Sequence, residues 1–211
     1  MKDQKLSHLE QDVLREIGNI GAGNATTSLS ELINKRIHME VPAVQLVTIN
    51  EMVDKIGGPE ELIVTVMFKF QGEMTGTVFF VLTIEEANMM IEQMTGLGQA
   101  DLFKDDIIDE MAASALKELA NILTGSYIAA LADMSGLHIQ PTIPFLSVDM
   151  AAATLVSGMI DISQETDYAL IIDTRMLDTE TSHSVRGHFL LIPDPISVPI
   201  LLKALGVRDE D

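Results

Sequence analysis

The chain has no cysteine among its 211 residues. A disulfide framework and thiolate ligation of zinc are therefore excluded, and a reducing compartment such as the cytoplasm is the natural expectation. The opening residues are charged rather than apolar, so we expect no secretory signal. The longest uncharged stretches, such as 119–132, are too short or too polar to span a bilayer. The sequence therefore predicts a soluble protein.

Basic residues are also scarce. Thirteen lysines and arginines stand against 32 aspartates and glutamates, which gives a formal net charge of −19. Such a charge repels phosphate backbones and anionic lipid, so we expect neither nucleic acid nor a membrane as a partner. The acidity serves solubility or attracts a partner with a basic face, and the charge alone does not choose between these explanations.

Several motifs of enzyme chemistry are missing. The five histidines are scattered, and His183 and His188 lack the His-x3-His spacing and the paired carboxylates of a zinc site, so we expect no metal. No Ser/His/Asp arrangement or thiol nucleophile is present. The glycine-rich segment 18–23 lacks the preceding strand and following Lys-Ser/Thr of a phosphate-binding loop. Glycine inside a helix costs up to about 1 kcal/mol, so these three glycines predict close approach by another backbone.

What the sequence does contain is an internal duplication. A polar residue, a glutamate, an asparagine and a proline recur at identical separations, as Asp12, Glu16, Asn19 and Pro42 and, 102 residues later, as Ser114, Glu118, Asn121 and Pro144. Identical residues at the same offset extend the match, namely Leu14/Leu116, Ile20/Ile122, Gly23/Gly125 and Leu29/Leu131. Chance aligns one such pair but not the whole set, so we infer an internal repeat.

Both halves show the same predicted order of a long helix, a strand, a short helix, a hairpin and a closing helix. In the first half these elements are 7–34, 41–49, 51–56, 62–70 with 77–82, and 85–94. In the second half they are 107–134, 143–148, 150–159, 169–177 with 188–192, and 198–205. We therefore predict an α+β fold of two αβαββα units with pseudo-two-fold symmetry, about six strands and two long motif-bearing helices. The whole chain, 1–211, would form one domain with repeats at about 7–97 and 105–207.

The polar motif has a specific geometry on a helix. Positions i, i+4 and i+7 fall within an arc of roughly 60°, so each Glu/Asn pair shares one stripe with its preceding polar residue. A carboxamide can orient a water molecule by accepting one proton and donating another, and a carboxylate can engage a partner's lysine. Such a stripe suits hydrolysis in which another molecule supplies the electrophile and metal. A solvated helix face, or an asparagine that bridges within the core, is the alternative, and the duplication favours function.

The pattern [Asp/Ser]-x3-Glu-x2-Asn-x22-Pro, present twice, resembles the CheC branch of the CheC/CheX/FliY family of chemotaxis phosphatases, over nearly the whole chain. This resemblance implies that the substrate is the aspartyl phosphate of the response regulator CheY, which itself supplies Mg²⁺ and a lysine. It implies that Asn19 and Asn121 align the attacking water and that Glu16 and Glu118 pair with the lysine. Supporting positions complete each motif, with Asp12 and Ser114 at the edge of the contact and Pro42 and Pro144 architectural.

The resemblance implies a second partner, the receptor deamidase CheD, and a protein that works as a monomer without a cofactor of its own. In the segment Ser147–Thr154, Asp149 stands among small side chains at the start of a predicted helix. An acidic residue there is ordinarily a cap. Because receptor deamidation sites are Gln or Glu flanked by Ala and Ser on helices, we predict instead that Asp149 contacts CheD. The alternative function for the whole chain is a non-catalytic adaptor that docks response regulators.

Overall fold

A computed structural model describes residues 7–96, 100–105, 107–159, 168–178 and 184–207. Within these ranges the chain forms six helices and nine strands. The helices are α1 (His8–Ile33), α2 (Ile49–Lys55), α3 (Ile84–Thr95), α4 (Glu110–Ser135), α5 (Ala151–Met159) and α6 (Ser197–Ala204). The strands are β1 (Ile37–Thr48), β2 (Leu62–Gly72), β3 (Gly76–Thr83), β4 (Phe103–Lys104), β5 (Ile107–Ile108), β6 (Ile139–Pro141), β7 (Phe145–Met150), β8 (Tyr168–Asp178) and β9 (Ser184–Pro193).

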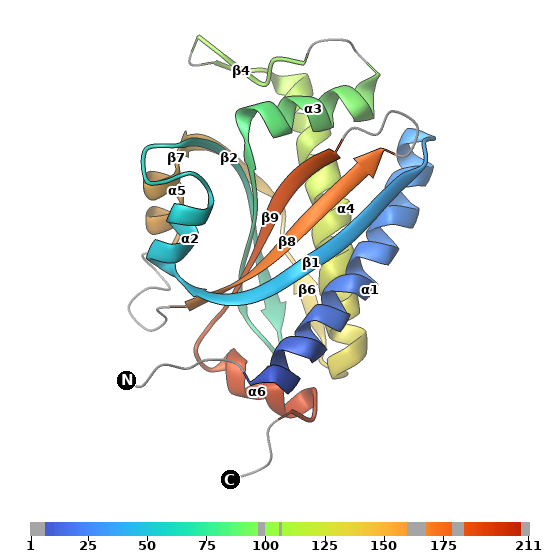
Figure 1. Cartoon of the computed structure of the whole chain (residues 1–211), viewed down its shortest axis with the longest axis vertical. Coiled ribbons are helices and arrows are strands. Elements are labelled where there is room, and N and C mark those ends of the chain that lie inside the picture. Colours follow the sequence, from blue (N-terminus) through green and yellow to red (C-terminus); the bar gives the residue numbers. More distant parts are fainter. Residues whose placement is uncertain (1–6, 97–99, 106, 160–167, 179–183, 208–211) are drawn as a thin grey trace.

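The two halves of the chain exchange strands in a single antiparallel sheet (Figure 1). The sheet order is β1-β8-β9-β3-β2-β6, and β7 also pairs with β2. The hairpins β2-β3 and β8-β9 meet through β3 and β9 at the centre. The strands that follow the two long helices each pair with the hairpin of the other half. Strand β1, which follows α1, lies beside β8, while β6 and β7, which follow α4, lie beside β2. Neither half therefore builds its part of the sheet alone.

The duplication is visible in the boundaries of the elements. Helices α1 and α4 start and end 102 residues apart, and so do strand β1 and the combined span of β6 and β7. The prolines of the repeat fall where strand pairing is interrupted: Pro42 lies in the register shift between Glu40 and Ala43, and Pro144 lies between β6 and β7. Proline has no N–H to donate to a strand ladder, which accounts for both interruptions.

Two details of the predicted elements need correction. The helix expected over 107–134 starts at Glu110, since Ile107–Ile108 instead pair with Phe103–Lys104 as a short ribbon. The Asp109 carboxylate caps this helix by accepting a hydrogen bond of 2.7 Å from the Ala112 N–H. The sheet also has seven strands rather than about six, because the second motif strand is divided at Pro144.

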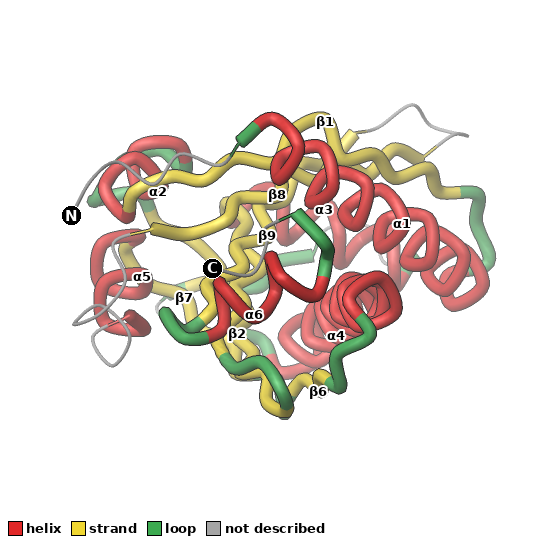
Figure 2. Tube along the Cα trace, turned by 90° about the horizontal axis from the view of Figure 1, so that it is seen from below, coloured by secondary structure: helices red, strands yellow, loops and turns green. Residues whose placement is uncertain are grey.

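The sheet carries helices on both faces (Figure 2). Alternate residues of the central strand β3 point to opposite faces, as expected for a pleated strand. Val78 and Phe80 join a core with residues of α1 and α4, whereas Phe79 and Val81 join a second core with residues of α2 and α5. The two motif helices α1 and α4 thus lie on the same face of the sheet, packed against each other and against the larger core.

The glycines of α1 differ in their surroundings. A Cβ added to Gly21 would lie 2.6 Å from Tyr127 Cδ1 and 3.0 Å from Tyr127 Cα, so this glycine lets α4 approach closely, as predicted. Gly18 instead faces a side-chain methyl of Val41 at 3.2 Å. A Cβ on Gly23 would meet nothing within 4 Å. The expectation of backbone contact is therefore confirmed for Gly21 and wrong for Gly18 and Gly23.

Candidate functional site

The ends of the motif helices are fixed by local signals. Helix α1 begins with a capping box, in which the Ser7 hydroxyl accepts from the Glu10 N–H at 3.2 Å and the Glu10 carboxylate accepts from the Ser7 N–H at 2.7 Å. It ends at Asn34 in the left-handed conformation, and α4 ends in the same way at Gly136. These caps fix the ends of the two helices that carry the motif.

All six helical positions of the motif are exposed, namely Asp12, Glu16, Asn19, Ser114, Glu118 and Asn121. The buried side of each helix lies opposite, with Leu14 and Ile17 on α1 and Leu116 and Leu119 on α4 packed in the core. Each stripe consequently faces away from the sheet. An asparagine that bridges within the core, the structural alternative, is excluded by this exposure.

The supporting residues have partners on their own helices. The Asp12 carboxylate forms an exposed ion pair of 2.9 Å with Arg15, and the Ser114 hydroxyl donates to the Glu110 carbonyl at 2.8 Å. In contrast, the side chains of the two Glu/Asn pairs, Glu16 with Asn19 and Glu118 with Asn121, form no hydrogen bond or ion pair within the described ranges. Their polar groups are therefore available to another molecule.

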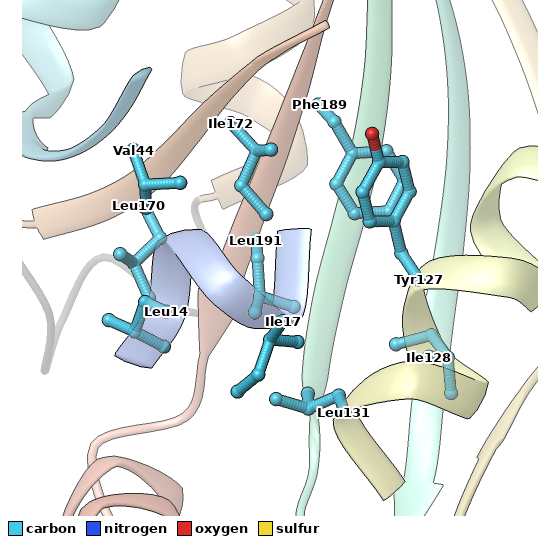
Figure 3. A pocket seen from close by; sticks show the side chains of 10 residues that line it. All are labelled: Leu14, Ile17, Val44, Tyr127, Ile128, Leu131, Leu170, Ile172, Phe189 and Leu191. Carbon is cyan, nitrogen blue, oxygen red and sulfur yellow. The ribbon is translucent and has the colours of Figure 1, made fainter. Parts of the chain in front are cut away.

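An apolar cavity of about 20 Å³ lies beneath the motif helices, close to the volume that one water molecule needs (Figure 3). Its lining comes from α1, α4 and the sheet: Leu14, Ile17, Val44, Tyr127, Ile128, Leu131, Leu170, Ile172, Phe189 and Leu191. The Tyr127 hydroxyl is hydrogen-bonded to Thr174 Oγ1 at 3.0 Å, and its ring lies 4.6 Å from that of Phe189. Burial raises the pKa of Tyr127 to about 12. This cavity contains neither Glu/Asn pair and is a packing feature of the core.

The described residues contain no group of three or more histidine and acidic side chains able to hold a metal ion. His188 is placed by β9 beside Asp173 of β8, with Nδ1 and Oδ1 2.8 Å apart, and this hydrogen bond lowers the pKa of Asp173. His183 lies outside the described residues. In the same ranges, no helix is both long and apolar enough to cross a membrane.

Asp149 lies near the end of β7 rather than in a helix cap. Its carboxylate accepts from the adjacent Met150 N–H at 2.7 Å, whereas an N-cap side chain accepts from the second or third residue of the helix. The first N–H groups of α5 reach loop carbonyls instead, from Ala151 to Glu61 at 2.8 Å and from Ala152 to Pro59 at 3.1 Å. The Asp149 side chain is therefore exposed and is not needed to start the helix.

Comparison with known proteins identifies the class to which this fold and these helices belong. A model of the CheC-like family matches residues 9–46 and 111–148, two segments that stand 102 residues apart. The chain is also 36% identical over 197 residues to the CheY-P phosphatase CheC of Bacillus subtilis (strain 168), which covers 93% of this chain and 94% of that protein. The chain therefore belongs to the CheC-like family.

More distant relatives share part of the sequence or the fold. The flagellar motor switch phosphatase FliY of Bacillus subtilis is 24% identical over 172 residues, which are 82% of this chain and 41% of FliY. The crystal structure of Thermotoga maritima FliY superposes with a TM-score of 0.73 at 21% identity, covering 97% of this chain and 99% of that one. The FliM middle domain from H. pylori gives 0.67 at 15% identity, over 94% and 99%. These likenesses confirm the α+β fold with its antiparallel sheet.

Proposed function

We propose that this chain hydrolyses the aspartyl phosphate of the response regulator CheY at two equivalent sites, one on α1 and one on α4. The observation that carries the proposal is the duplicated Glu/Asn pair, exposed in both helices and without partners among the described residues. The relative that is 36% identical over most of the chain is named a CheY-P phosphatase, which supports the same reaction here.

In this proposal the Asn19 or Asn121 amide accepts a hydrogen bond from a water molecule and holds it in line with the phosphorus atom. The water oxygen bonds to phosphorus as the bond to the aspartyl oxygen breaks, and inorganic phosphate and a free carboxylate result. The Glu16 or Glu118 carboxylate pairs with the regulator's lysine, which fixes the docked orientation. We expect the regulator to supply Mg²⁺, so that this chain needs no cofactor of its own.

Such a mechanism makes modest chemical demands on the chain. Phosphoryl transfer depends mainly on positioning and on electrostatic stabilisation, with little covalent work by the catalyst. A neutral amide and a carboxylate on a rigid helix can provide positioning, and no nucleophile from this chain is required. Because one chain carries both stripes, the proposal needs no second copy, and a monomer in the cytoplasm remains our expectation.

A non-catalytic adaptor would use the same stripes only to dock the regulator. Incubation with phosphorylated CheY, while inorganic phosphate is followed over time, separates the two functions. We expect phosphate to appear faster with the chain than with the regulator alone. An adaptor would form a complex with the regulator and leave the rate of phosphate release unchanged.

We also propose that CheD binds at Asp149. The support is that this carboxylate is exposed, is not needed as a helix cap, and is followed by small residues, of which Ala153 is also exposed. We expect Asp149→Lys to weaken CheD binding in a pull-down and to leave phosphate release from CheY intact, since the segment lies outside both Glu/Asn motifs. Asp133→Lys, an equal charge change at an exposed position of α4, is the control. Full CheD binding by the folded Asp149→Lys variant would remove this role.

A further inference from the structure

At two positions of the motif helices α1 and α4, nothing within the described chain requires the residue to be as small as glycine. Gly23 and Gly125 are equivalent in the repeat, and a Cβ added at either would meet nothing within 4 Å. Both lie inside helices, where alanine is intrinsically more favourable than glycine. Gly21 shows the usual explanation, because Tyr127 of the neighbouring helix occupies the space beside it. For Gly23 and Gly125 the space is open to solvent, so a need for it would come from another molecule.

Their position points to the same site as the Glu/Asn pairs. Each glycine follows its asparagine by four residues, so Gly23 lies within the arc that contains Glu16 and Asn19, about 6 Å further along the axis. An asparagine side chain is short. Its amide reaches a phosphoryl group that is recessed in a partner's surface most easily where the helix surface around it is bare. A glycine one turn away provides such a bare surface.

The opposite end of each stripe carries an exposed apolar side chain. Leu9 is 59% exposed and Met111 is 68% exposed, and they too are equivalent in the repeat. Each precedes the first polar residue of its stripe, Asp12 or Ser114, by three positions. A single exposed leucine has no special meaning. Recurrence of the exposure in both copies, in line with the same polar residues, indicates a shared contact.

We propose that the regulator docks along the whole strip from Leu9 to Gly23, and equally from Met111 to Gly125, a length of about 21 Å on the helix. Leu9 or Met111 anchors an apolar side chain of the regulator at one end. Gly23 or Gly125 admits the regulator's surface against the helix backbone at the other end, beside the asparagine. This inference rests on the proposed function, because the molecule that docks on the strip is the phosphorylated receiver domain of CheY.

Replacement of both glycines by alanine is expected to stabilise the protein and at the same time to weaken its binding of the regulator. In the double variant Gly23→Ala/Gly125→Ala, the two alanines should together raise the melting temperature by about 4–8 °C, since each favours its helix and clashes with nothing. The same variant should raise the KM for phosphorylated CheY about tenfold, and Gly23→Leu/Gly125→Leu should raise it further. Ser28→Ala and Ser28→Leu, at an exposed position about 140° around α1 from Gly23, should leave KM unchanged.

The apolar anchor has its own matched control. Leu9→Ser/Met111→Ser should raise KM by several-fold, whereas Leu32→Ser/Met134→Ser should not. Leu32 and Met134 are also equivalent in the repeat and are 49% and 43% exposed, but they lie near the other ends of the helices. If the wild-type chain is active and Gly23→Leu/Gly125→Leu leaves the KM unchanged, the inference about the docking strip is wrong while the proposed function stands. A wild-type chain that neither binds phosphorylated CheY nor releases phosphate from it would overturn the proposed function and, with it, the inference.

Discussion

Replacement of Gly21 by alanine tests how the two motif helices are held together. The added Cβ would lie 2.6 Å from a ring carbon of Tyr127 and 3.0 Å from its Cα, whereas ordinary contacts begin near 3.4 Å. The ring can tilt, but the backbone of α4 must move away. Overpacking of this kind costs about 1–3 kcal/mol. Alanine restores about 1 kcal/mol through its helix propensity, so an overpacking cost in the middle of that range leaves a net loss of about 1 kcal/mol.

For a chain of this size, that loss corresponds to a fall in melting temperature of about 2–4 °C. Thermal unfolding followed by far-ultraviolet circular dichroism measures it, with Gly23→Ala, only two residues away, as a control expected to shift in the opposite direction. Below the transition, phosphate release should stay near the wild-type rate, because the Glu16 and Asn19 side chains face away from the contact. A Gly21→Ala protein as stable as the wild type would refute the close approach of α1 and α4.

Two further predictions concern the core and the docking surface. The pKa of Tyr127 is raised from 10.0 to about 12, so between these pH values the folded state keeps a proton that the unfolded state loses. The free energy of unfolding is therefore unaffected by this group below about pH 10 and falls by about 2–3 kcal/mol as the pH rises to about 12. Denaturant titrations across this window should show the loss in the wild type and a smaller loss in Tyr127→Phe; identical pH profiles would contradict the burial. The double variant Glu16→Lys/Glu118→Lys should weaken binding of phosphorylated CheY by charge repulsion, and the effect should be smaller in high salt. The corresponding Gln variants should have milder effects, and Glu31→Lys, about four turns along α1, should have little effect on binding. Unchanged affinity in the double charge reversal would exclude the pairing with the regulator's lysine.

The repeated features of this fold could be predicted from the sequence because each arises from local residues. Two copies of one pattern gave two long helices with boundaries 102 residues apart. Leu14 and Leu116 are buried, and helical periodicity places both of them opposite the polar stripe. The exposure of the two asparagines follows from the same periodicity.

Features that depend on distant parts of the chain could not be predicted in this way. The exchange of motif strands between the halves is set by pairing across more than 60 residues, of which the sequence gives no local sign. The ribbon β4-β5 is too short to show a period. Asp149 resembled a cap until carbonyls of Pro59 and Glu61, far away in sequence, proved to hold the start of α5. Gly21 and Gly23 look alike in sequence and differ only in what packs beside them.

The rate of phosphate release from phosphorylated CheY, measured for Asn19→Ala, Asn121→Ala and the double variant, tests the central claim most directly. Each amide is proposed to orient water at its own site, so each single variant should be slower and the double variant should lose about 10²-fold or more. Asn24→Ala, an exposed asparagine about 140° around α1 from Asn19, should keep the wild-type rate. A folded double variant with wild-type activity would show that the Glu/Asn stripes do not catalyse the reaction.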